Sequence, residues 1–184
     1  MLTVGMILLD GGLSAEAKKI FGVARAKVGE DPLLQALLQV ASARAGNASG
    51  EHRDVLEALN AYIAANEGDV MSGGLDEGPY LLSERAAAEL GLFAKDKDPA
   101  RLPRAESDLY GAAAILLQRR SASPKIELDF WNCFLQYLLV LEAQDRCEAV
   151  LGLIEGERLK KGTAAFAPPG LQERFDKLER DCKQ

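Results

Sequence analysis

The chain of 184 residues carries 28 acidic and 22 basic side chains, one histidine and three cysteines, and 48% of its residues are apolar. Its formal charge of -6, with no basic cluster longer than Arg119-Arg120 or Lys160-Lys161, disfavours a nucleic-acid ligand, because phosphate backbones require a positive surface. Alanine (28) and leucine (29) are abundant, whereas valine, isoleucine and threonine together number 16. Since β-branched residues favour strands and alanine and leucine favour helices, the composition predicts a soluble all-α protein.

The N-terminal part is expected to begin with a packed apolar segment, Met1 to Leu9, and to continue with three helices. The segment is too short to span a bilayer and lacks the basic start and cleavage site of a secretory signal. Apolar residues at helical spacing predict helices over residues 14–28, 33–45 and 51–66. Ser14 is the expected cap of the first, and Asp31 followed by Pro32 marks the start of the second.

Residues 67–78 interrupt this pattern with four glycines and four acidic residues. We expect a mobile acidic loop here, and any subdivision of the single domain to fall at this loop. Carboxylates of this kind bind calcium or magnesium in other proteins, but Gly73 and Gly74 stand where an EF-hand loop needs oxygen ligands. No metal site is therefore expected.

Five further helices are predicted in the C-terminal part, over residues 79–93, 104–119, 125–143, 146–161 and 171–182. The helix over 125–143 is the most apolar and carries Phe130, Trp131, Phe134 and Tyr137. Because a helix that is apolar over so wide an arc must be covered on several sides, we expect these rings to form a core. The alternative is a cofactor or ligand pocket near Trp131 and Tyr137.

Residues 130–162 combine an aromatic-rich helix, a short turn, and a helix with a small, a large and a small residue at Ala149, Leu153 and Gly156. This hairpin resembles a tetratricopeptide repeat (TPR), in which small residues let paired helices approach closely. Similar triplets stand at residues 17/21/24, 58/62/65 and 105/109/112. The resemblance implies a TPR-like stack of antiparallel helical hairpins spanning a single domain, 1–184, and a compact irregular bundle is the alternative.

No residue is predicted to be catalytic or to bind a cofactor or a metal ion. His52 is the only histidine, has no motif for a nucleophile beside it, and is expected on the solvated surface. Glu84 and Glu89 are not spaced to meet on one helix face. The three cysteines, Cys133, Cys147 and Cys182, are odd in number and form no Cys-x-x-Cys pair, so we expect unpaired thiols and a cytoplasmic or other reducing compartment.

These features favour a non-enzymatic protein–protein interaction module, an accessory subunit or an adaptor or chaperone, that binds a peptide, helix or subunit of another protein. A stack of hairpins leaves a long face for such recognition. Two alternatives belong to other classes: a small helical enzyme or ligand-binding bundle with its pocket near Trp131 and Tyr137, and an acidic inhibitor or immunity-type protein. Neither nucleic acid nor a membrane span is expected.

Overall fold

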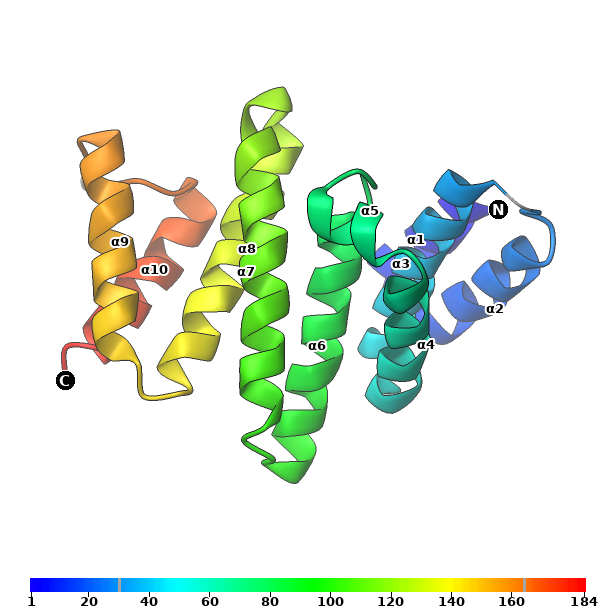
Figure 1. Ribbon diagram of the computed structural model, residues 1–184, viewed down its shortest axis with the longest axis horizontal. Coiled ribbons are helices and arrows are strands. Elements are labelled where there is room, and N and C mark those ends of the chain that lie inside the picture. Colours follow the sequence, from blue (N-terminus) through cyan, green and yellow to red (C-terminus); the bar gives the residue numbers. More distant parts are fainter. Residues whose placement is uncertain (30, 164) are drawn as a thin grey trace. The chain divides into compact units, whose positions relative to one another are not determined.

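A computed structural model describes residues 1–29, 31–163 and 165–184. The described residues form α-helices and one 3-10 turn and contain no β-strand (Figure 1), so the predicted all-α class is confirmed. The elements are α1 (Leu2–Asp10), α2 (Ser14–Arg25), α3 (Pro32–Ala48), α4 (His52–Ala65), α5 (Glu67–Ser72), α6 (Gly78–Asp96), α7 (Arg101–Arg119), η1 (Arg120–Ala122), α8 (Pro124–Glu142), α9 (Cys147–Lys161) and α10 (Pro169–Asp181).

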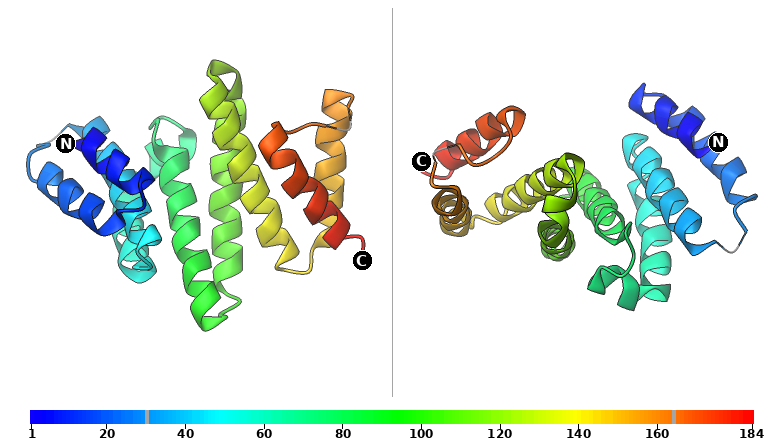
Figure 2. Two further views of the ribbon diagram at one scale, coloured as in Figure 1. Left: turned by 180° about the vertical axis from the view of Figure 1, so that it is seen from behind. Right: turned by 90° about the horizontal axis from the view of Figure 1, so that it is seen from above.

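The chain divides into two compact units, Met1–Asp108 and Leu109–Gln184, and the division falls within α7. In the first unit α1 packs on α2 and α3, and both α3 and α4 pack on α6. In the second unit α8 packs on α9, and α10 lies against both of them (Figure 2). Although α3 and α4 also pack on α6, contacts between consecutive helices supply most of the packing within each unit.

Polar caps fix the starts of α3 and α8. The Asp31 carboxylate accepts hydrogen bonds from the backbone N–H groups of Leu33 and Leu34, at 3.0 and 3.1 Å. The Ser123 hydroxyl accepts one from Ile126 at 3.2 Å, with Pro124 as the first residue of α8. Each cap satisfies backbone donors that the first helical turn leaves without a partner, so the predicted starts at these two places are confirmed.

Two segments for which no helix was predicted are helical. The apolar N-terminal segment forms α1, and its Gly5 lies so close to the ring of Phe21 that a Cβ atom would overlap with it. The expected loop over 67–78 begins with α5, in which Val70 is completely buried. The prediction of a mobile loop is therefore wrong for residues 67–72. A helix of six residues with one buried side chain is too short to show an apolar periodicity.

The triplets behind the TPR resemblance differ in burial. The residues of two triplets, 17/21/24 and 105/109/112, are all buried. Ala58 and Ala65 are exposed, and Leu153, the large residue of the best-matching hairpin, is 38% exposed. Small residues thus line close helix contacts at two of the four places, and the repeat architecture stays a prediction.

Candidate binding site

Other aromatic rings surround Trp131, where a ligand pocket was the alternative to a core. Trp131 is fully buried, and the rings of Phe130, Phe134, Phe166 and Phe175 surround it, with centroids 4.9 to 6.1 Å away. Rings at such separations make favourable edge and tilted contacts. The expectation that this stripe forms core is confirmed for the three residues Phe130, Trp131 and Phe134, which are at most 8% exposed.

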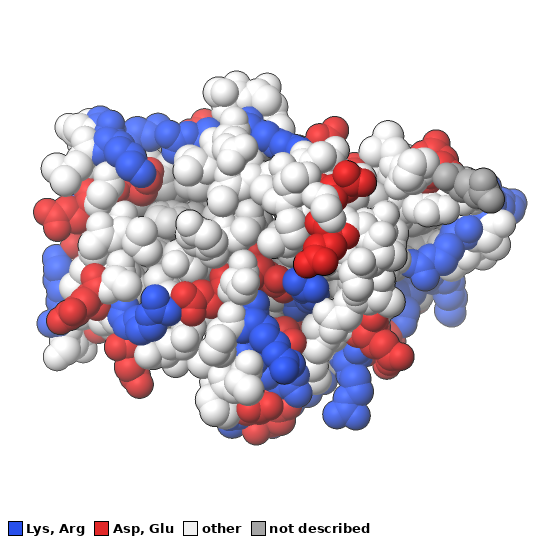
Figure 3. Space-filling model, in the orientation of Figure 1, with Lys and Arg blue, Asp and Glu red and all other residues white. Residues whose placement is uncertain are grey.

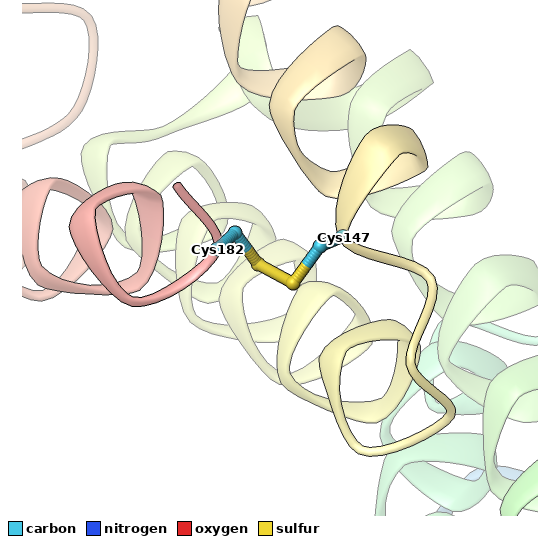
Figure 4. Close-up of a disulfide and its surroundings, with 2 residues drawn as sticks. All are labelled: Cys147 and Cys182. Atoms are coloured by element: carbon cyan, nitrogen blue, oxygen red, sulfur yellow. A yellow bond between two sulfur atoms is a disulfide. The ribbon is translucent and has the colours of Figure 1, made fainter. Parts of the chain in front are cut away.

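Two of the three cysteines are not unpaired as predicted. Cys147, the first residue of α9, forms a disulfide with Cys182 at the end of α10, and their Cα atoms are 5.0 Å apart (Figure 4). Cys133 is a buried thiol that donates a hydrogen bond to the carbonyl oxygen of Leu109. The disulfide therefore corrects the prediction of unpaired thiols for Cys147 and Cys182. It weakly disfavours the predicted reducing compartment, where disulfides are rare.

Charged side chains join α9 to α10 as well. Both guanidinium Nη atoms of Arg158 donate to the carboxylate of Glu179, which also accepts from Lys183 at 2.7 Å. Hydrogen bonds from Arg158 and then from Lys183 lower the pKa of Glu179 to about 2. A groove of about 720 Å³ along these helices includes this ion pair and the exposed side chain of Leu159.

His52 is half-buried, which corrects its predicted place on the solvated surface. Its imidazole lies where a Cβ atom of residue 91 would stand, so α4 and α6 can meet there only because that residue is glycine. The amide nitrogen of Asn47 donates to Glu84, so its oxygen accepts from Nδ1 of His52 at 3.2 Å, and Nδ1 carries the proton. Burial, and then the charge of Lys95, lowers the pKa of His52.

Stability is expected to fall when the pH drops from about 7 to about 5, because the unfolded chain then protonates His52 before the folded chain does. Above pH about 6.5 neither state binds this proton, so the residue adds no pH dependence there. Urea unfolding at the two pH values measures the effect, and the variant His52→Gln should lose less stability over the same interval. An equal loss in both proteins would assign the pH dependence to other groups.

A polar pocket of about 300 Å³ lies in the first unit, between α4, α6 and the first part of α7. We call it the polar pocket, and its lining residues are Asn60, Arg85, Glu89, Arg104, Ser107 and Asp108. The side chains come from three helices and both signs of charge are present. The fold thus brings together charged side chains from separate segments of the first unit.

A buried ion pair forms one wall of the polar pocket. Arg85 donates from Nε and Nη2 to the two oxygens of Asp108, at 2.7 and 2.6 Å, and from Nη1 to Oδ1 of Asn60 at 3.3 Å. Asp108 is 6% exposed. Burial raises the pKa of its carboxyl group, and the hydrogen bond and charge of Arg85 oppose this shift. Planar two-point pairing of this kind fixes the guanidinium in one orientation.

Glu89 forms the second buried carboxylate of the polar pocket. It is 3% exposed and accepts a hydrogen bond from Nη1 of Arg101 at 2.9 Å. Arg101 also donates from Nε and Nη2 to Asp96, at 2.9 and 2.7 Å. Arg104 stands one turn further along α7, with its side chain 68% exposed and its Nη1 3.7 Å from Glu89. Each buried carboxylate therefore has an arginine as its own counter-ion.

The chemistry of the polar pocket suits recognition. Its two carboxylates, Glu89 and Asp108, already accept hydrogen bonds from arginines. Its lining contains neither histidine nor cysteine. A general base needs an unshared proton acceptor beside a nucleophile, and within the described residues no hydrogen bond joins Ser107 to a carboxylate or an imidazole.

Sequence reasoning considered only Glu89 of this group, as a possible partner of Glu84. The structure separates those two carboxylates, since Glu84 accepts from Arg44 and Glu89 from Arg101. The signal that points to the site is Asp108, which stands among the buried residues 105, 109 and 112 on one face of its helix. A carboxylate at a core position demands a buried partner.

An exposed aromatic surface lies in the second unit. Tyr110 on α7 is 63% exposed, and its ring lies 5.9 Å from that of half-buried Tyr137 on α8. Leu117, seven residues beyond Tyr110 and thus on the same face of α7, is 40% exposed. We call these three residues the tyrosine surface. Tyrosine is enriched in protein interfaces because it offers a large apolar ring and a polar tip.

The described residues contain no candidate for a metal site or a membrane span. No group of three or more histidine, cysteine or acidic side chains is placed to hold a metal ion. In the same part of the chain, every helix falls short of the length or the apolarity that crossing a bilayer requires. Basic and acidic side chains are interspersed over the face of the molecule seen in Figure 3.

The chain matches no protein-family model, and it shows no significant similarity to a curated protein or to a solved structure.

Proposed function

We propose that this protein is a non-enzymatic interaction module, built from stacked helical hairpins, that serves as an accessory subunit or adaptor and binds another protein. The observation that carries the proposal is the tyrosine surface. Tyr110 is mostly exposed, its ring lies beside that of Tyr137, and the exposed Leu117 lies on the same face of α7. Such a group of residues is typical of the positions that anchor protein interfaces. The polar pocket adds a site for charged contacts.

Replacing Tyr110 with serine is expected to lower the affinity for the partner by about tenfold or more, because buried tyrosines at interfaces contribute a large part of the binding energy. The tagged full chain is used to capture proteins from an extract of its source, and a partner present at constant stoichiometry is then purified for titration. The exposed position of Tyr110 should leave the melting temperature of the variant unchanged.

Leu33→Ser is the matched control, since Leu33 is also an exposed apolar residue, 49% exposed, and lies in the first unit. It should bind the partner as the unmodified chain does. Failure to capture any stoichiometric protein, together with a melting temperature raised by a metabolite, would contradict the proposal and favour a ligand-binding bundle. A partner enzyme that loses its activity on binding would make the protein an inhibitor.

A further inference from the structure

The polar pocket offers more hydrogen-bond donors than acceptors. Both oxygens of Asp108 already accept from Arg85, and Oδ1 of Asn60 accepts from the same guanidinium. In Glu89, one oxygen accepts from Arg101 and the other faces Arg104 at 3.7 Å. Three of the four carboxylate oxygens therefore already accept from arginines, and the fourth faces Arg104.

Three side chains of the polar pocket have hydrogen-bond donors that are available to a ligand. Arg104 carries five N–H groups in a flat guanidinium, and the structure gives it no hydrogen bond, only the longer ion-pair contact with Glu89. The amide nitrogen of Asn60 is not used by the hydrogen bond that its oxygen accepts. The hydroxyl of Ser107 lies on α7 one turn from Arg104. A ligand that fits this set supplies hydrogen-bond acceptors, and a carboxylate would also pair with the charge of Arg104.

We propose that the polar pocket binds the side-chain carboxylate of an acidic residue on the partner protein, with Arg104 as the principal contact and Asn60 and Ser107 as further donors. The inference rests on the proposed function and names the chemistry of the partner. A volume of about 300 Å³ accepts a single side chain of this size and is at the lower end for a drug-sized ligand. A guanidinium donating to a carboxylate is the stronger, two-point form of ion pairing.

The buried carboxylates of the polar pocket already have arginine counter-ions, which offset their repulsion of a bound carboxylate. Asp108 is held at 2.6 and 2.7 Å by Arg85, and Glu89 at 2.9 Å by Arg101. Asp108 and Glu89 act as positioning residues that hold the guanidinium groups of Arg85 and Arg101 in place. Since Arg104 is 68% exposed, it can turn toward an incoming carboxylate without breaking a hydrogen bond.

The test is a titration of the full chain, labelled with ¹⁵N, with a triglutamate peptide that is acetylated and amidated so that it has only side-chain charges. The expected result is a saturable shift of the Nε–H signal of Arg104 and of the amide signal of Asn60. A triglutamine peptide with the same ends should shift neither signal. Arg104→Gln should weaken the binding by about tenfold or more, because a charge-assisted pair is lost.

Arg174→Gln is the matched control, since it removes the same charge from an exposed position on α10 and should leave the peptide affinity within about twofold. The inference is overturned if the glutamate peptide causes no shift, if the glutamine peptide causes the same shift, or if Arg104→Gln binds as before. Stronger binding of inorganic phosphate at the same signals would also overturn it, since the pocket would then be a site for a free oxyanion.

The captured partner separates this inference from the proposed function. If the partner binds the Arg104→Gln chain as tightly as the unmodified chain but loses affinity for the Tyr110→Ser chain, the interaction module stands and the carboxylate site fails. If the chain captures no partner, but the triglutamate peptide still shifts the signal of Arg104, the carboxylate site stands and the interaction module fails.

Discussion

Replacing both Cys147 and Cys182 with serine is expected to lower the free energy of unfolding by about 4 kcal/mol. The disulfide closes a loop with a sequence separation of 35 residues, and the chain-entropy estimate for a loop of that length gives this value. Urea unfolding followed by the fluorescence of Trp131 measures the change, because the only tryptophan lies in the same unit as the disulfide.

Reduction supplies the control for this experiment. The unmodified chain in excess dithiothreitol should match the double variant, and the double variant should not respond to the reductant. Unfolding curves of the unmodified chain that coincide with and without reductant would show that the two thiols are not joined in solution.

Replacing Phe134 with alanine should cost about 3 to 5 kcal/mol, since it removes a large buried ring from a packed core. The ring of Phe134 contacts three others, Phe130, Trp131 and Phe175, at centroid distances of 5.8, 6.1 and 6.0 Å. Its loss leaves a cavity beside the tryptophan. The unfolding midpoint of Trp131 fluorescence should therefore move to a lower urea concentration, and the emission of the folded variant should change as well.

Leu128→Ala on the same helix is the comparison for this variant. Leu128 is 44% exposed, so its truncation should change the free energy of unfolding by less than about 0.5 kcal/mol. Equal effects at the two positions would contradict the burial pattern of α8 and the central place of Phe134 in the second unit.

The parts of the fold that depend on local sequence could be predicted. Asp31 with Pro32 marks the start of α3 because a carboxylate and a proline act on the same helical turn. The aromatic stripe of α8 indicates a core because Phe130 and Phe134 are four residues apart and share a face. Both inferences need only neighbours along the chain.

The parts that depend on distant residues could not be predicted. Cys147 and Cys182 are brought together by the return of α10, and nothing in their spacing selects that pair over the other two. The partners in the polar pocket are also far apart, with a sequence separation of 23 between Arg85 and Asp108. His52 is covered because residue 91, on another helix, is glycine. Such contacts follow from tertiary packing, which propensity and periodicity do not encode.

The link between Cys147 and Cys182 makes the C-terminal part of this protein a covalent ring, because it joins the start of α9 to the end of α10 (Figure 4). A protease that cuts the backbone once between Lys161 and Pro169 would therefore release no fragment. The nicked molecule would keep its original mass plus one water, and only the combination of a cut and a reductant would set the last helix free.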